Sequence, residues 1–337
     1  NVTLELNKEF YKIVITDGVG FRSFDKLPEG KYTYSATYKG TDKISRAIDS
    51  GVFEVKAVEY NVILNAPDVK MIYHDGTRFI ATLTDKQGNP IRDAAIEITI
   101  NGKTYTKTTD EKGVVSLGLS LDSGIYSVVV KFKGLLNYTP ITKQAKVTIE
   151  PTVKGLDVVK MFRNNTQYYA IFTDSQGNPL KNKDIQFNIN GVFYTKTTND
   201  KGIAMMGINL NPGKYVITAI NMVTGEQSGN NITVKSLIVQ NDLTKYYLNA
   251  SRFQTTIYNK DGSLAVNKEV TFNINGVFYT KTTDSNGVAS LGIALRPGNY
   301  TITTMYDGLD IGNKVTVLPT LVTKDLSMKY LDGSNFT

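Results

Sequence analysis

The twelve residues FNINGVFYTKTT occur twice in this chain, at Phe187–Thr198 and at Phe272–Thr283, and a related stretch, ITINGKTYTKTT, occupies Ile98–Thr109. In all three, alternating apolar and polar residues flank the dipeptide Asn-Gly. This dipeptide is typical of a two-residue hairpin turn, because both central positions of a type I′ turn have positive φ. The stretch therefore predicts a β-hairpin, and its recurrence at steps of 89 and 85 residues predicts duplicated modules of domain size.

A two-residue turn also fixes which residues of the hairpin lie opposite each other. It sets Phe187 opposite Tyr194 and Ile185 opposite Lys196, so this row is expected to point toward the core. Phe193 lies between the members of that row and is expected to face the other way.

Two further patterns recur with the same step. L-x-x-G-x-Y supplies the repeat markers Gly30, Tyr32, Gly124, Tyr126, Gly213, Tyr215, Gly298 and Tyr300. D-[VL]-x3-[YF]-x3-[ST]-x-[FY] begins at Asp68, Asp157, Asp242 and Asp325. Together the patterns predict an incomplete module at 1–67 that lacks its opening strands, full modules at 68–156, 157–241 and 242–324, and the opening strand of a further module at 325–337.

In the second full module, the alternation of apolar and polar residues between turns predicts no helix and seven short strands. These strands lie near 157–163, 166–173, 183–189, 192–198, 203–210, 214–221 and 231–236. Seven short strands with a turn every 8–12 residues are typical of an antiparallel immunoglobulin-like β-sandwich of roughly this size. The Tyr of L-x-x-G-x-Y is expected to bond back to the main chain, as a tyrosine corner does. The chain has no Cys and no Trp, which excludes an antibody-type domain. The fold class is therefore all-β, with tandem sandwiches arranged end to end because the connections are short.

The module DSQGNPLKNKDIQFNINGVFYTKTTNDKGIAMMGINLNPGKYVITA resembles the immunoglobulin-like repeats of adhesin-like surface proteins of methanogenic archaea. The residues that carry the resemblance are the D-x-x-G-N-P turn, the N-G hairpin, the T-T-D/N turn and L-x-P-G-x-Y, and it spans nearly the whole chain. The third full module departs from it at Asn259–Ala265, where the first turn lacks Pro. The resemblance implies a secreted, repetitive cell-surface protein, and it transfers no catalytic residue.

Catalytic and metal-binding patterns are not found in the sequence. His74 is the only His, lies in a polar stretch and is not repeated in the sister modules, so we interpret it as a surface residue. Asp85, Asp110, Asp174 and Asp284 recur in turns, where an Asp commonly caps its own turn; a calcium site would need several converging oxygen ligands. Basic residues outnumber acidic ones by 38 to 31 but are scattered, which does not indicate a nucleic-acid footprint. We expect no cofactor, no metal and no enzyme activity.

An intramolecular Lys–Asn isopeptide bond is a sharper possibility. The lysines of the opening strands, Lys70, Lys160, Lys245 and Lys329, follow their Asp at different distances and so alternate between sheet faces. Lys107, Lys196 and Lys281 share one position on the inward row of the hairpin, but Ile13 replaces them in the first module. We favour lysines that extend their ammonium groups to solvent at a strand end. A loss of one ammonia per module in the intact mass would contradict this.

Two sets of surface residues are candidates for contacts. Phe193 and Phe278 occupy one exposed position of the repeated hairpin, where Thr104 stands in the first full module; packing against a neighbour is the simpler interpretation. Seven N-x-[ST] sequons are candidate glycosylation sites: Asn1, Asn137, Asn164, Asn231, Asn249, Asn299 and Asn335.

The sequence favours a non-enzymatic stalk or adhesin region, extracellular at the cell surface, whose partner is a wall polymer, a cell-surface polymer or another cell. The sequence contains no apolar run long enough to span a membrane. The alternative is a filament subunit: residues 325–337 would add a strand to the incomplete module of the next chain, a self-association through edge strands. These residues cover only part of what that module lacks, and truncation of a longer array is the simpler interpretation.

Overall fold

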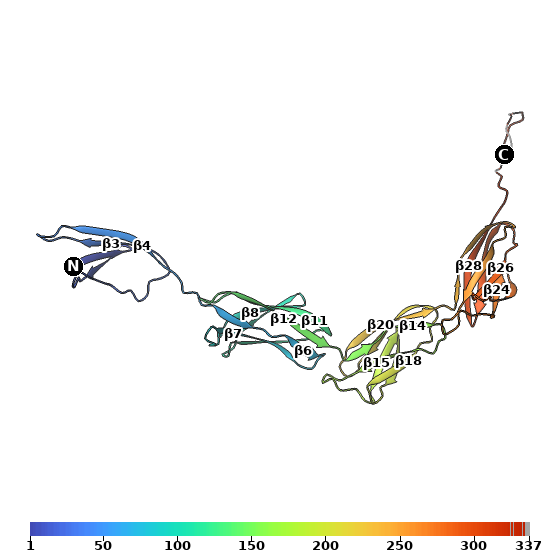
Figure 1. The fold of residues 1–337 in the computed structure, drawn as a ribbon, viewed down its shortest axis with the longest axis horizontal. Helices are drawn as coiled ribbons and strands as arrows, with labels where there is room; N and C mark the ends of the chain where they lie inside the picture. The colour runs from blue at the N-terminus through green and yellow to red at the C-terminus, as the bar shows by residue number, and fades with distance from the viewer. Residues whose placement is uncertain (324, 326, 332, 334–337) are drawn as a thin grey trace. The chain divides into compact units, whose positions relative to one another are not determined.

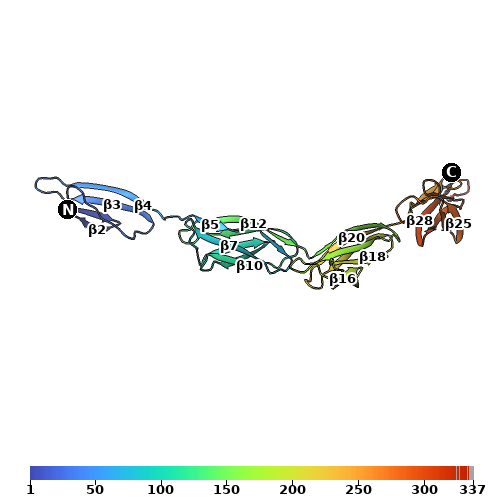
Figure 2. The ribbon, with the colours of Figure 1, turned by 60° about the horizontal axis from the view of Figure 1, so that its bottom comes forward.

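The computed structural model describes every residue except 324, 326, 332 and 334–337. The chain forms two compact units, of which the first contains Asn1–Met71, Gly76–Ser120 and Gly124–Ile149, and the second contains the remainder. All regular elements of the described residues are β-strands, so no helix there can span a bilayer. Figures 1 and 2 show a single sheet in the N-terminal part and two facing sheets in each module that follows. The predicted all-β class with tandem sandwiches is confirmed.

The N-terminal part of unit 1 is one sheet with the strand order β2-β1-β3-β4. This order corresponds to the last four strands of the larger sheet in the complete modules. Of its apolar side chains only Leu6 and Tyr32 are buried, because no second sheet among the described residues covers it. The strands are β1 (Val2–Leu6), β2 (Glu9–Ile13), β3 (Gly30–Tyr38) and β4 (Ala47–Val55).

The complete sandwich of unit 1 has a three-stranded sheet in the order β10-β7-β5 and a five-stranded sheet in the order β6-β12-β11-β8-β9. Its strands are β5 (Val62–Asn65), β6 (Val69–Ile72), β7 (Arg78–Asp85), β8 (Ala95–Ile100), β9 (Lys103–Thr108), β10 (Val114–Gly118), β11 (Gly124–Phe132) and β12 (Ile141–Glu150).

Unit 2 contains two sandwiches with the same strand order, β13-β15-β18 with β14-β20-β19-β16-β17, and β21-β23-β26 with β22-β28-β27-β24-β25. The first consists of β13 (Val153–Gly155), β14 (Val158–Met161), β15 (Gln167–Phe172), β16 (Asp184–Ile189), β17 (Val192–Thr197), β18 (Ile203–Gly207), β19 (Gly213–Ile220) and β20 (Gln227–Lys235). The second consists of β21 (Ile238–Gln240), β22 (Leu243–Tyr246), β23 (Arg252–Ile257), β24 (Glu269–Ile274), β25 (Val277–Thr282), β26 (Val288–Gly292), β27 (Gly298–Tyr306) and β28 (Leu309–Leu318).

The sequence patterns missed the first strand of each sandwich. β13 pairs with β15 and β21 pairs with β23, yet both strands precede the module starts expected at residues 157 and 242. We propose that each module begins a few residues earlier, with this short strand. Of residues 325–337, those that the structure describes lie in no strand, and the rest of this expected opening strand falls outside the described residues.

The register predicted for the repeated hairpin is confirmed. Phe187 pairs with Tyr194 and Ile185 with Lys196, and Asn190 and Gly191 have φ of 53° and 79°. The predicted row of the second strand faces the inner side, where Tyr194 and Lys196 border a hollow beside Met206, but it is not buried in the core. Val192, Tyr194 and Lys196 are exposed, and so are Lys107 and Lys281, because β9, β17 and β25 are edge strands that the three-stranded sheet does not reach.

The last Thr of the quoted stretch has a specific structural role. Thr198 is buried; its hydroxyl donates to the carbonyl of Leu180 and accepts the N–H of Lys183. Thr109 and Thr283 make the same two bonds in their own modules. This Thr therefore ties the end of the hairpin to the loop that precedes it.

The predicted tyrosine corners are present. Tyr32, Tyr215 and Tyr300 each donate a hydrogen bond to the carbonyl four residues earlier, at 2.7–2.8 Å. The glycine of the motif gives the ring room: a Cβ on Gly213 would lie 3.1 Å from the hydroxyl of Tyr215. The L-x-x-G-x-Y motif thus fixes the entry into the strand that follows.

The core of the last sandwich contains two hydroxyl groups without a partner, on Thr255 and Thr304, and both residues are buried. The sandwich of unit 1 has Val130 where this one has Thr304. A buried hydroxyl without a partner costs about 1–3 kcal/mol, and Val has nearly the same shape as Thr. We expect Thr304→Val to stabilise this module by about 1 kcal/mol, measured as a higher midpoint of thermal unfolding; a lower midpoint would show that the hydroxyl has a partner.

Candidate functional site

One repeated surface feature is an exposed aromatic side chain on the edge strand of the hairpin. Phe193 is 59% exposed and Phe278 is 62% exposed, as the alternation predicted. Sequence reasoning missed Phe10, which is 69% exposed and occupies the same position, two residues after the turn. The signal was Asn7-Lys8 in place of Asn-Gly: both residues have positive φ, so the turn has the same form. Three of the four hairpins therefore present a Phe at one site.

The opposite side of the same edge strand borders a hollow. Next to β17 it has a volume of about 330 Å³ and is lined by Ile189, Tyr194, Lys196, Met206 and Leu210, among others. It exists because the three-stranded sheet ends at β18 and leaves the inward face of β17 open. Exposed apolar groups thus lie on both faces of the hairpin edge.

The recurrent Asp that opens each module ties the first strand of the larger sheet to the last. Asp157 accepts the main-chain N–H and the side-chain amide of Asn231, at 2.8 and 3.1 Å. These bonds, the main-chain N–H first, hold the pKa of Asp157 below its usual value. Asp68 likewise accepts the main-chain N–H of Lys146, and Asp242 accepts that of Lys314.

The carboxylates of Asp157 and Asp242 make the fold sensitive to acid. A pKa that is lower in the folded chain than the unfolded value near 3.8 stabilises the fold above that pH, and this contribution is lost as the pH falls through the folded-state pKa. We expect the thermal midpoint to fall below about pH 4. Asp157→Asn should lower the midpoint at pH 6, and this effect should shrink as the pH falls below about 4; an effect that does not change with pH would contradict an electrostatic role.

The other recurrent Asp residues cap their own turns, as the simpler interpretation held. Asp85 accepts the N–H groups of Gln87 and Asn89, and Asp110 accepts those of Lys112 and Val114. Asp174 and Asp284 make equivalent bonds. Within the part of the chain that the structure describes, no group of three or more His, Asp or Glu side chains could hold a metal ion.

His74 is exposed and stacks on Tyr73, with the ring centroids 3.9 Å apart. Its φ is 57°, and Arg163 and Leu248 have the same conformation at the equivalent turn positions. The position therefore needs a residue that tolerates positive φ, which accounts for a His there.

Two opening-strand lysines, Lys160 and Lys245, are buried, whereas Lys70 is exposed, which agrees with the predicted alternation of faces. The Lys160 ammonium donates to the carbonyls of Thr166 and Ile208, and burial lowers its pKa. Lys245 donates to carbonyls at the equivalent positions, those of Ser251 and Ile293, and also to that of Asn249. An isopeptide bond would need an Asn or Asp side chain at the ammonium, whereas the bonds described are to main-chain oxygens. These lysines fasten two loops to the first strand of the larger sheet.

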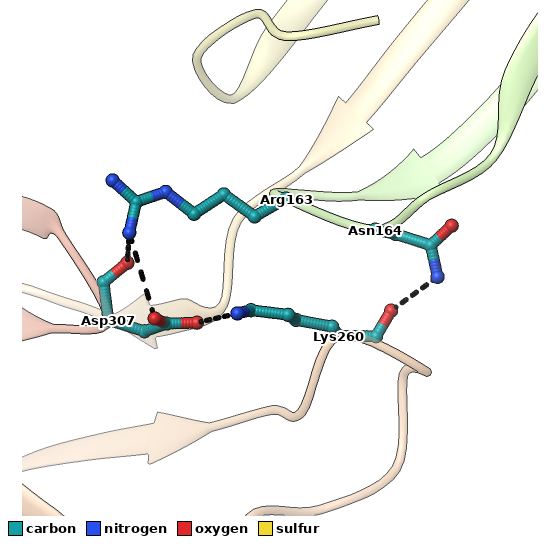
Figure 3. Close-up of polar contacts among 4 residues, drawn as sticks. All are labelled: Arg163, Asn164, Lys260 and Asp307. Carbon is teal, nitrogen blue, oxygen red and sulfur yellow. Dashed lines mark hydrogen bonds and ion pairs between the residues drawn. The ribbon is translucent and has the colours of Figure 1, made fainter. Parts of the chain in front are cut away.

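The two sandwiches of unit 2 meet at a polar junction, shown in Figure 3. Arg163 donates to the main-chain carbonyl of Asp307 at 2.9 Å, and Lys260 lies 3.0 Å from its carboxylate. The side-chain amide of Asn164 donates to the carbonyl of Lys260 at 2.8 Å. Beneath them, buried apolar residues of both sandwiches form one continuous cluster that includes Leu237 and Ile238.

The sequon residues differ in the state of their side-chain amides. The amide nitrogens of Asn164 and Asn231 donate hydrogen bonds, to Lys260 and Asp157, so a glycan would have to break these bonds. Asn1, Asn137, Asn249 and Asn299 are exposed and stay predicted acceptors. Asn335 lies outside the described residues.

Strand order and register define the class of protein as a tandem array of immunoglobulin-like sandwiches. No protein-family model matches the chain. The chain is similar to the inverse autotransporter adhesin YeeJ of Escherichia coli (strain K12), with 25% identity over 235 residues, which are 63% of this chain. The aligned residues span only 9% of the length of YeeJ.

Two solved structures cover much of the chain. An adhesin, described as stabilised by Ca²⁺, with which an Antarctic bacterium binds ice has 18% identity, covers 94% of this chain and 89% of its own, and gives a TM-score of 0.24. A tandem of titin domains has 14% identity, covers 77% of this chain and 100% of its own, and gives a TM-score of 0.27. At such scores the assignment of the fold rests on the strand pairing described above.

Proposed function

We propose that these residues form a load-bearing, non-enzymatic region of a cell-surface adhesin. The similarity to an adhesin of Escherichia coli supports this class. The archaeal source and the extracellular location, both implied by the resemblance found in the sequence, belong to the same proposal. A wall polymer, a cell-surface polymer or another cell is the proposed partner.

The observation that carries the proposal is the parallel pairing of the first and last strands of the larger sheet. In unit 2, β14 pairs in parallel with β20 and β22 with β28, so Val158 lies beside Ile232 and Met161 beside Lys235. Tension along the chain passes through the short strand β13 to the start of β14 and leaves the module at the end of β20. Because the strands are parallel neighbours, this tension shears them and loads all their hydrogen bonds at once.

The bonds around this strand pair add to its resistance. Asp157 fastens the start of β14 to Asn231 in β20, and Lys160 fastens the end of β14 to the carbonyl of Ile208. These bonds must break before β14 can slide past β20. A module built in this way suits a stalk that carries load between a cell and its target.

Single-molecule force spectroscopy tests the proposal. A tethered chain should unfold in discrete events, and Val158→Pro should lower the unfolding force of one event, because the N–H of residue 158 points toward β20, on the same side as that of Phe162, which donates to the carbonyl of Lys235. Phe193→Thr is the matched control, because it alters an exposed residue of the same module and should leave every event unchanged. The proposal is wrong if Val158→Pro has no effect on the forces, or if the chain hydrolyses wall polymer.

The filament assembled by strand donation stays an alternative proposal. The inner face of the N-terminal sheet, where only Leu6 and Tyr32 are buried, is the surface against which a strand from another chain would pack. Removing residues 325–337 should abolish filaments seen by negative-stain microscopy; isolated particles both with and without these residues would end this alternative.

A further inference from the structure

The outward face of the larger sheet carries a row of four residues that starts at the hairpin edge. Phe193 lies opposite Asn188, Asn188 opposite Thr218, and Thr218 opposite Gly229. Residues directly opposite in antiparallel strands share a face and lie about 5 Å apart. The four therefore form one continuous line across β17, β16, β19 and β20.

The N-terminal sheet and the larger sheets of the three sandwiches are equivalent, and three of these four sheets share this line, which we call the Phe row. Each has an exposed Phe, then a side chain with a carbonyl or carboxylate oxygen, then a hydroxyl, then a small residue. The three Phe rows are Phe193-Asn188-Thr218-Gly229, Phe278-Asn273-Thr303-Gly312 and Phe10-Glu5-Ser35-Ser50.

The fourth sheet differs at every position of the row. Where Thr104 replaces Phe, the line continues with Thr99, Val129 and Gln144. It therefore has no ring, no carboxamide or carboxylate in the second place, no hydroxyl in the third and a long side chain in the fourth. The hairpin pairs in the same register there, so the fold does not require the Phe row. Residues that change together without a structural need indicate a shared contact.

The small residues at the end of the row keep the surface open. Neither Gly229 nor Gly312 has a positive φ. A Cβ on Gly229 would meet only Val216, at 3.7 Å, which is ordinary contact. The backbone does not need glycine there, and the effect of the glycine is an unobstructed shelf beside Thr218.

The chemistry of the row selects one class of ligand. A flat aromatic face packs against apolar C–H groups, and a neighbouring carboxamide and hydroxyl donate and accept hydrogen bonds. A sugar ring offers C–H groups on its face and hydroxyls at its edge. Two Phe rows carry no charge and the third carries Glu5, which would repel an anionic polymer. We propose that the Phe rows bind the sugar rings of a neutral polysaccharide, an inference that rests on the proposed adhesin function and names its partner.

Several weak rows on one chain produce useful attachment to a repetitive polymer. A single exposed ring with two or three polar groups binds weakly, but linked sites raise the overall affinity by a factor of about 100 or more. Loss of one Phe is therefore expected to weaken binding only a few-fold, whereas loss of all three should lower the apparent affinity at least ten-fold.

Native gel electrophoresis of the full chain through gels containing a soluble β-glucan, an α-mannan or a galactomannan tests this, with polygalacturonate as the anionic comparison. We expect at least one neutral polymer to retard the chain, and the triple variant Phe10→Thr, Phe193→Thr, Phe278→Thr to lose at least ten-fold in apparent affinity. Phe21→Thr is the matched control, because Phe21 is 85% exposed but lies outside the rows. Building a row with Thr104→Phe, Thr99→Asn, Val129→Thr and Gln144→Gly should increase retardation.

The proposal is overturned if no neutral polymer retards the parent chain, if the triple variant is retarded equally, or if polygalacturonate retards the chain more strongly. Unfolding forces separate this failure from failure of the load-bearing function, since the Phe rows take no part in the parallel strand pairs. If the triple variant shows unchanged unfolding forces and unchanged retardation, the load-bearing function remains supported and the polysaccharide site is contradicted.

Discussion

Replacing Phe187 with Ala is expected to destabilise its module by about 3–5 kcal/mol, whereas replacing Phe193 with Ala should change stability by less than about 0.5 kcal/mol. Both residues belong to the same hairpin. Phe187 is fully buried and packs against Tyr168 and Phe172, with ring centroids 5.3 and 6.1 Å apart. Its loss leaves a cavity in the core, while Phe193 loses only contacts with solvent.

Hydrogen exchange followed by mass spectrometry measures this effect module by module, since a chain of several domains has no single free energy of unfolding. Peptides from residues 152–235 should exchange much faster in the Phe187→Ala variant than in the parent chain. In the Phe193→Ala variant their exchange rates should not change. Peptides from unit 1 provide the internal reference. Equal effects of the two substitutions would mean that the assignment of the hairpin faces is wrong.

Replacing Gly155 with Ala is expected to destabilise the same module by about 1–3 kcal/mol, the usual range for overpacking. A Cβ at this position would lie 2.2 Å from the hydroxyl of Tyr168 and 2.3 Å from Oδ1 of Asn230. Tyr168 is completely buried and its hydroxyl donates to Asn230 at 2.8 Å, so the ring cannot move aside. Burial also raises the pKa of Tyr168 to about 12, so the hydroxyl stays a donor at neutral pH.

The sister sandwich supplies the compensating change. It has Phe253 in place of Tyr168 and Gln240 in place of Gly155. Tyr168→Phe alone should cost about 1 kcal/mol, and the double variant Gly155→Ala, Tyr168→Phe should be more stable than the sum of the single effects allows. A double-mutant cycle on the midpoint of unfolding measures this coupling; strict additivity would show that the hydroxyl is not the obstacle.

Local sequence determined the hairpin and the corner. Asn190-Gly191 sets the register by turn geometry alone, and the Gly–Tyr spacing of L-x-x-G-x-Y places a hydroxyl at the main chain four residues back. Both are short-range effects, so they can be read from neighbouring residues. The seven strands predicted in the second full module follow from the same alternation and turns.

Strand β13 was missed because three residues, Val153–Gly155, have too little alternation to be recognised, and only pairing with β15 makes them a strand. The burial of Lys160 was missed for a similar reason. The carbonyls that bind its ammonium come from loops that are 6 and 48 residues away.

The repeated stretch shows which structural features can be predicted from the sequence and which cannot. The sequence by itself determined that the hairpin forms, which of its residues pair and that Phe193 faces solvent, because turn chemistry and a period of two suffice. Only the tertiary structure decided that Tyr194 is exposed, since this depends on how far the opposite sheet extends. The Phe row, likewise, is assembled from four strands that are distant in sequence and become neighbours only through long-range pairing.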